Sequence, residues 1–230
     1  MHTVPLIQSP SGTCLFVSRR YEKMLLPELA SAPTAELEES IRHHARKRRA
    51  LQDGMWESRE ILTLDAASAH PGLVVSPDRH SVWHGNSWGC PPSDRRRFFP
   101  ASCILGSEGF SSGRHRWEVE VGGEDGWAVG VARESVRRRR GPMKLQPQHG
   151  VWAVELGRYQ LLPLSLWSPK AAPSQRPHRI RVCLDYEGGR VSFYDAENLT
   201  PLFTFTASFT ETLYPFFWLW APGARITLCP

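Results

Sequence analysis

One run of residues, Gly113 to Val121, places the tightest constraint on how this chain can fold. From residue 117 onward the run alternates between Trp or Val and Glu. A period of two is that of a β-strand, and it places the large apolar side chains on one face of a sheet. The glycine-rich residues 122–126 then reverse the chain, and residues 127–131 repeat the pattern. Two adjacent strands therefore present one apolar face that a second layer must cover.

Similar strand-like patterns occur from residue 61 to the end of the chain. Short alternating or apolar runs recur with turn signals between them, and no long helical pattern interrupts them. About a dozen strands without a long helix predict an all-β protein, a two-sheet antiparallel β-sandwich. We expect the strands at residues 61–65, 73–76, 80–84, 102–105, 116–121, 127–133, 151–156, 180–186, 190–194, 202–206, 214–219 and 225–228.

Two proline-bearing stretches, residues 86–97 and 162–177, resist assignment to strands. Long loops on a packed scaffold are where binding residues usually lie. We therefore expect the function of the chain to reside on its loops. The strand tryptophans and their aromatic neighbours are expected in the core, because the alternation alone explains them. These core residues are Trp117, Trp127, Trp152, Tyr186 and Phe193.

The N-terminal quarter of the chain has a different character. Residues 1–33 show no usable periodicity and are expected to be poorly ordered. Residues 34–60 predict a helical linker, with acidic residues in its first turn and basic residues towards its end. Apolar positions from Leu37 to Met55 follow coiled-coil spacing, but His44 and Arg48 interrupt the seam. The favoured interpretation is a linker helix that packs on the next domain, and the alternative is a weak dimer through residues 34–58.

Composition excludes several classes of protein. The 230 residues carry a net charge of +5, which is too mild for a typical nucleic-acid-binding protein. The five cysteines are odd in number and lack C-x-x-C spacing, so reduced thiols are expected rather than a metal site or a disulfide framework. No apolar run approaches the ~18 residues that suggest a membrane span. We expect a cytoplasmic protein with no metal, no cofactor and no nucleic-acid partner.

Short motifs recur in order from residue 61 to the end of the chain. They are Leu64-Asp65, Leu105-Gly106, Phe110 to Val121, Trp127 to Val131, Leu184 to Glu187, Val191 to Tyr194 and Leu228 to Pro230. Together they resemble the B30.2, or PRY–SPRY, domain. Residues 150–156 and 215–220 look more like the butyrophilin branch of that family than the tripartite-motif branch. The resemblance implies a bent two-sheet antiparallel sandwich, with PRY at about residues 61–108 and SPRY at about residues 109–230.

The resemblance also implies a function. B30.2 domains bind protein partners through their loop face and perform no reaction. The favoured hypothesis is a butyrophilin-like cytosolic domain in immune regulation or signalling, at the cytosolic face of the plasma membrane if the chain is part of a full butyrophilin. Contact with a membrane is then expected only through segments that this chain lacks. The alternative is the substrate-recognition part of a tripartite-motif ubiquitin ligase without its RING.

An enzyme is the least favoured class. Residues 109–113 match G-x-S-x-G, but a strand follows them where a nucleophile elbow requires a helix. The partner-binding loop face is expected to include strand-end and loop residues of the types that usually anchor interfaces. These residues are Glu124, Asp125, Glu155, Arg158, Tyr159, Trp167 and Trp220.

Two further expectations concern charge. One butyrophilin-branch member binds phosphorylated isoprenoids through a basic pocket, and the pocket residues of that relative align with Ala128, Gln160 and Trp218 here. Loss of three cationic or donor groups would leave a diphosphate poorly neutralised, so no phosphoantigen binding is expected. The run Arg137 to Arg140 is interpreted as a solvated loop, with an acidic partner or anionic lipid as the sharper alternative.

Overall fold

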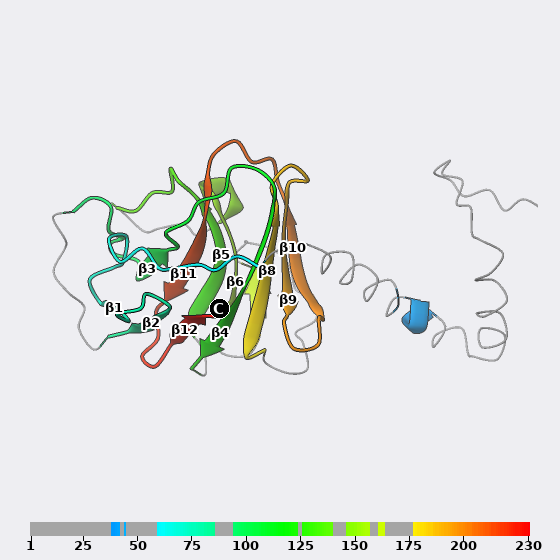
Figure 1. Ribbon diagram of the computed structural model, residues 1–230, viewed down its shortest axis with the longest axis horizontal. Helices are drawn as coiled ribbons and strands as arrows, with labels where there is room; N and C mark the ends of the chain where they lie inside the picture. The colour runs from blue at the N-terminus through cyan, green and yellow to red at the C-terminus, as the bar shows by residue number, and fades with distance from the viewer. Residues whose placement is uncertain are drawn as a thin grey trace, which may run out of the picture. The chain divides into compact units, whose positions relative to one another are not determined.

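A computed structural model describes residues 38–41, 44, 59–85, 94–123, 126–139, 146–156, 161–163 and 177–230 (Figure 1). The chain divides into two compact units, residues 1–45 and 46–230. In the first unit, residues 38–41 are helical, within the linker helix expected at residues 34–60. Most of that helix and all of residues 1–33 lie outside the described residues.

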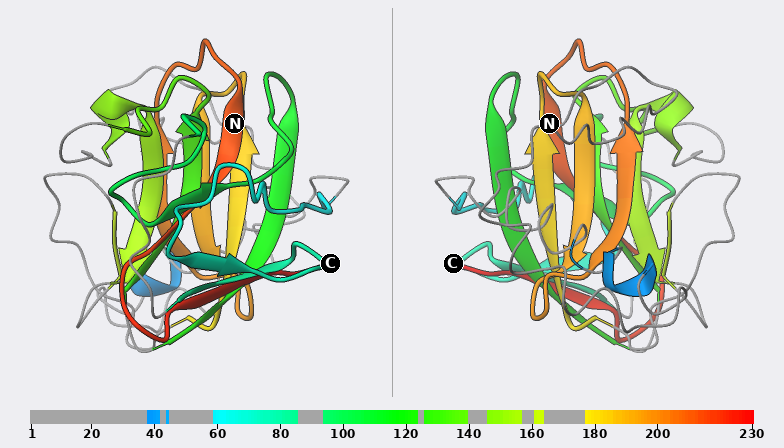
Figure 2. Two further views of the ribbon diagram at one scale, coloured as in Figure 1. Left: turned by 90° about the vertical axis from the view of Figure 1, so that its left-hand side faces the viewer. Right: turned by 90° about the vertical axis from the view of Figure 1, so that its right-hand side faces the viewer.

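In the second unit the described strands form two antiparallel sheets (Figures 1 and 2). One sheet has seven strands in the order β1-β2-β12-β4-β8-β9-β10, and the other has five in the order β3-β11-β5-β6-β7. A single described 3-10 turn, Pro147–His149, precedes β6. The strands are β1 Leu73–Val75, β2 Ser81–His84, β3 Cys103–Leu105, β4 Arg114–Gly122, β5 Trp127–Arg133, β6 Val151–Leu156, β7 Leu161–Pro163, β8 Arg179–Asp185, β9 Arg190–Asp195, β10 Pro201–Thr206, β11 Leu213–Leu219 and β12 Arg225–Leu228.

The core lies between the two sheets, as the alternation predicts. The apolar residues of β4 face those of β5 and β6 in one continuous cluster. Trp117, Trp127, Trp152 and Phe193 are all at most 2% exposed, which confirms their expected core role. Each such side chain contributes about 1.5–3 kcal/mol by its removal from water. Tyr186 is half-buried against the same cluster and donates its hydroxyl to the Glu211 carbonyl at 2.9 Å.

The glutamates that alternate with the apolar residues of β4 lie on the opposite face of the seven-stranded sheet. Glu118 pairs with Arg181 of β8 at 2.8 Å, and Glu120 pairs with Arg179 one step along the same strand pair. Opposite charges directly across two strands support the pairing register. The alternation of Trp or Val with Glu therefore gives β4 one buried face and one face of salt bridges.

Two strand predictions are wrong. Residues 61–65 make only an isolated bridge, Leu64 to Gly106, because the Asp65 carboxylate accepts the Ala67 N–H at 2.9 Å and turns the chain there. Strand β7, Leu161–Pro163, runs into the stretch at residues 162–177 that was expected to be a loop. Its Pro163 is the last residue of an edge strand, and prolines within sheets occur mainly at edge strands.

Several features bear on what kind of site the fold can hold. Across the described ranges, no helix is long and apolar enough to cross a membrane. The same residues contain no cluster of three or more His, Cys, Asp or Glu side chains arranged to hold a metal ion. Cys103, Cys183 and Cys229 are buried thiols.

Candidate functional site

The outer face of the five-stranded sheet, which points away from the core, carries a row of residues from three strands. Trp218 of β11 lies opposite Ala128 of β5, and Ala128 lies opposite Glu155 of β6. Neighbouring strands are about 4.8 Å apart, so the Trp218 and Glu155 backbones are separated by roughly 10 Å. Ala128, which lies between them, is fully buried.

Two tryptophans form the aromatic part of this face. Trp218 and Trp220 are two residues apart at the end of β11, so both side chains point to the same side. Their ring centroids are 4.1 Å apart with an interplanar angle of 40°. Both residues are only partly buried. They pack against a second apolar cluster on the outer face, which includes Ala128 and Phe216, rather than against the core between the sheets. They present a large amphipathic surface that still reaches solvent.

The turn before β5 holds Trp220 in place. The Trp220 N–H donates to the Gly126 carbonyl at 2.9 Å. Gly126 has a φ of 87°, and a Cβ at this position would collide with the Cβ of Ala221. Only glycine allows the turn to approach Trp220 so closely. The glycine-rich turn at residues 122–126 therefore has a positional role as well as a reversing one.

Glu155 supplies the charged part of the face. It is half-buried, and burial raises the pKa of its carboxyl above the ordinary value of 4.5. Among the described residues it has no hydrogen-bond or ion-pair partner. A carboxylate that is partly removed from water and lacks a cation is stabilised by any cationic group that reaches it. The arrangement therefore suits a ligand with a positive charge beside an apolar or planar group.

The predicted site residues divide into those that the structure describes and those that it does not. Glu155 and Trp220 both lie on the outer face, and Ala128 and Trp218 bring them together. Trp218 was not predicted as a contact residue, although its spacing of two from Trp220 is the signal that identifies it. The remaining predicted residues lie outside the described ranges: Glu124, Asp125, Arg158, Tyr159 and Trp167.

Two of the three positions aligned with the phosphoantigen pocket lie in this row. Ala128 and Trp218 are directly opposed in the strand register. Neither carries a cationic group, and the nearest titratable member of the row is the acidic Glu155. Gln160, the third position, lies outside the described residues. The absence of phosphoantigen binding stays a prediction, and the charge of this row is consistent with it.

Sequence comparison identifies the class of domain that this sandwich and its outer face define. The chain matches the SPRY domain family over residues 114–230 and the SPRY-associated domain family, PRY, over residues 62–110. It therefore belongs to the B30.2, or PRY–SPRY, family, whose domains are protein-interaction modules.

Individual relatives come from both branches of the family. Butyrophilin subfamily 1 member A1 of Homo sapiens is 40% identical over 80% of this chain and 36% of its own length. The E3 ubiquitin-protein ligase TRIM15 of Sus scrofa is 45% identical over 73% of this chain and 37% of its own length. The crystal structure of the TRIM65 PSpry domain superposes with a TM-score of 0.68 at 27% identity, and covers 78% of this chain and 95% of that chain.

The chain thus spans little more than a third of the length of these two curated relatives. Because both butyrophilin and tripartite-motif proteins match, the preference for the butyrophilin branch stays a prediction.

Proposed function

We propose that this domain binds a protein partner on the outer face of its five-stranded sheet. Trp218 and Trp220 are the apolar anchors, and Glu155 receives a Lys or Arg side chain of the partner. Aromatic side chains surrounded by polar groups are the commonest source of binding energy at protein interfaces. The domain performs no reaction on its partner.

The observation that carries this proposal is the half-buried carboxyl group of Glu155 on the same sheet face as the indole pair, two strands from Trp218. No described residue neutralises it, and burial already raises its pKa. A partner guanidinium could bond the carboxylate while its planar face stacks on an indole. Both interactions favour Arg over Lys, because only guanidinium is planar and forked.

The other predicted contact residues are close in sequence to this face. In the sequence, Arg158 and Tyr159 follow shortly after Glu155, and Glu124 and Asp125 directly precede Gly126, whose carbonyl accepts the Trp220 N–H. We propose that these residues and Trp167 form the rim of the interface. Rim residues exclude water from the central contacts and set specificity more than affinity.

The biological setting follows from the choice of branch. We infer a butyrophilin-like domain on the cytosolic side, where partner capture serves immune regulation or signalling. The 45% identity to TRIM15 favours a second candidate, the substrate-recognition end of a ubiquitin ligase. The full-length transcript separates the two. Upstream immunoglobulin and membrane-spanning segments support the first, and upstream RING cysteines support the second.

The binding face is tested by selection from a displayed random-peptide library on the full chain. We expect enriched peptides to carry Arg or Lys next to an aromatic or aliphatic residue. The double variant Trp218→Ala/Trp220→Ala should lose this enrichment, and Glu155→Gln should lose the basic preference. The control Trp83→Ala removes another partly buried tryptophan, which lies on β2 of the other sheet.

The result that contradicts the proposal is equally definite. If the double variant remains folded by circular dichroism and still selects the same peptides as the wild type, the outer face is not the binding site. If Glu155→Gln retains the preference for basic residues, the carboxylate does not receive the cation.

A further inference from the structure

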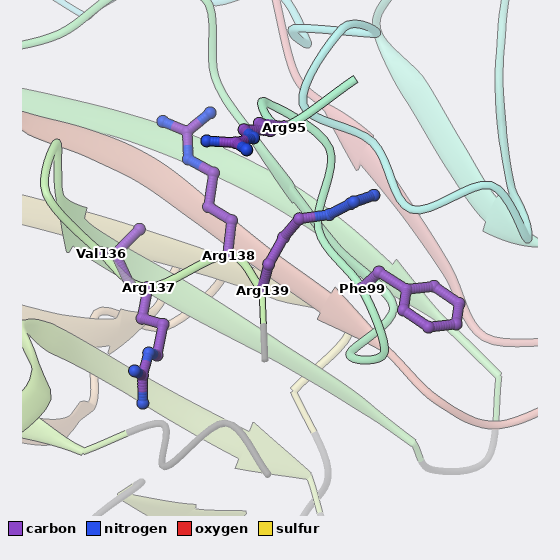
Figure 3. A pocket seen from close by; sticks show the side chains of 6 residues that line it. All are labelled: Arg95, Phe99, Val136, Arg137, Arg138 and Arg139. Atoms are coloured by element: carbon purple, nitrogen blue, oxygen red, sulfur yellow. The ribbon is translucent and has the colours of Figure 1, made fainter. Parts of the chain in front are cut away.

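A second feature of the surface is a hollow of about 840 Å³ that is lined by arginines (Figure 3). It lies between the segment before β3 and the segment after β5. We call it the arginine hollow, and the described residues that line it are Arg95, Phe99, Val136, Arg137, Arg138 and Arg139. Its volume is that of a ligand-sized site, for which roughly 300–1,000 Å³ is typical.

The wall of the arginine hollow is held by contacts between its two segments. The Phe99 N–H donates to the Arg138 carbonyl at 2.9 Å, and the Arg138 guanidinium donates to the Arg96 carbonyl at 3.0 Å. The same guanidinium lies over the Phe98 ring, 5.5 Å from its centroid. Phe98 is fully buried and contacts Phe216 on the outer face of the sheet edge-on. The arginines therefore project from a packed base.

Two of the lining arginines keep their positive charge exposed. Arg95 and Arg137 are exposed and form no ion pair with any carboxylate of the described residues. Asp94, the acidic residue nearest in sequence, is bound by Arg96 through a two-pronged contact, with its shortest distance 2.9 Å. Like charges that share one hollow repel, so an anion that enters it gains from several cations at once.

We propose that the arginine hollow binds an acidic segment of a protein partner, with carboxylate or phosphate groups held by the guanidinium groups. Figure 3 shows that the side chain of Arg137 points away from those of Arg138 and Arg139. The cationic groups are therefore spread along the hollow and do not converge on one point. Such a spread fits several anionic groups on one extended chain better than a single small anion. Each guanidinium can bond a carboxylate or phosphate in a bidentate manner.

The two apolar lining residues favour a peptide over the other polyanions. Val136 is buried and Phe99 half-buried, so an aliphatic side chain between acidic residues has a surface to contact. One face of Phe99 is already stacked on His70, with centroids 5.6 Å apart and an interplanar angle of 7°. The binding of single-stranded nucleic acid relies on open aromatic faces. A membrane surface is flat, whereas these arginines line a hollow.

This site is separate from the one proposed for basic partners. The arginine hollow lies beyond the end of β5 at Arg133, whereas Trp218 is paired with Ala128 near the start of that strand. Within β5 alone, the interval from Ala128 to Arg133 corresponds to roughly 16 Å. One partner with a basic and an acidic segment could occupy both sites, but each site is testable alone.

The test uses the full chain and a synthetic peptide of alternating glutamate and leucine, with binding followed by fluorescence anisotropy. We expect saturable binding that weakens as salt is added. Arg95→Gln/Arg137→Gln should raise the Kd roughly fivefold, because each exposed ion pair contributes less than about 1 kcal/mol. The control Arg79→Gln/Arg225→Gln removes two exposed arginines outside the hollow and should leave the Kd unchanged. Both double variants should unfold at the wild-type temperature.

Binding measurements with further ligands identify the anionic group. A phosphoserine–leucine peptide that binds more tightly than the glutamate peptide, with the same arginine dependence, assigns phosphate groups to the site. A lysine–leucine peptide should not bind the hollow. Equal Kd values for the wild type and Arg95→Gln/Arg137→Gln would overturn the proposal. Tighter arginine-dependent binding to phosphatidylserine vesicles or to single-stranded RNA would also overturn it. Neither double variant should change the library selection that tests Trp218 and Trp220, so the two proposals fail separately.

Discussion

The two faces of the five-stranded sheet differ although they are built from the same strands. On the inner face, Trp127 and Trp152 are at most 2% exposed and pack among aliphatic residues. On the outer face, Trp218 and Trp220 are only partly buried, and the Glu155 carboxyl group has no hydrogen-bond or ion-pair partner among the described residues. The two faces of one sheet therefore place their tryptophans in different surroundings. The inner tryptophans stabilise the fold, and the outer ones are available for contact.

The largest expected effect is on the inner face. Trp152→Ala removes a side chain that contacts Phe209 edge-on at 5.1 Å and lies beneath the Arg133 guanidinium. We expect the free energy of unfolding to fall by about 3–5 kcal/mol, as for other buried tryptophans. Trp220→Ala should cost about 1 kcal/mol or less, because its side chain is half-buried. Urea denaturation followed by circular dichroism measures both, and equal losses would contradict the division between the two faces.

An intermediate effect is expected at Gly126, directly before β5. Gly126→Ala forces a side chain into a left-handed backbone conformation and against Ala221. The strain should lower the free energy of unfolding by roughly 1–3 kcal/mol. Because Gly126 binds the Trp220 backbone, the same change should also weaken peptide binding on the outer face. Gly223→Ala is a matched control, since Gly223 has a φ of 85° but a Cβ there meets nothing within 4 Å.

If Gly223→Ala and Gly126→Ala weaken peptide binding equally, the effect is general to left-handed glycines. The contact between Gly126 and Trp220 would then have no special role in the site.

The smallest expected effect concerns the charge on the outer face. The raised pKa of Glu155 means that the folded protein holds this proton more tightly than the unfolded chain does. The protonated Glu155 carboxyl group therefore makes its full contribution to the free energy of unfolding below pH 4.5. That contribution is lost as the pH rises through the pKa that this group has in the folded protein. Glu155→Gln should stabilise the fold at neutral pH by less than about 1 kcal/mol, given solvent screening, while it weakens partner binding.

Thermal unfolding of the wild type and Glu155→Gln across the acidic to neutral range measures this difference. The gain in stability of the variant should grow as the pH rises. A gain that is constant with pH, or a loss, would show that the carboxylate carries no cost of burial.

The inner face was predictable from the sequence, and the outer face was only partly so. The alternation from Trp117 to Val121 determines which residues face the core, because a strand has a strict period of two. The pattern does not say which outward residues other segments then cover. Phe216 and Trp218 alternate identically along β11, yet Phe216 is fully buried and Trp218 is not. Trp220 and Glu155 were expected from the family resemblance, whereas Trp218 was missed as a contact.

Long-range contacts account for the other differences. The run of arginines at residues 137–140 is visible in the sequence, but nothing local places Arg95 beside it. That juxtaposition depends on the hydrogen bond between the Phe99 N–H and the Arg138 carbonyl, which joins segments far apart in the chain. Strand β7 was missed because Pro163 argues against a strand unless its position at the sheet edge is known.

The central claim is that the outer face, and not the tryptophan-rich core, contacts the partner. The most direct measurement is the set of indole N–H signals in nuclear magnetic resonance spectra of the full chain, which has nine tryptophans. The chain is titrated with a peptide enriched in the library selection. We predict that the Trp218 and Trp220 signals shift on binding while those of Trp117, Trp127 and Trp152 stay in place. Saturable binding that leaves the Trp218 and Trp220 signals unmoved would contradict the account.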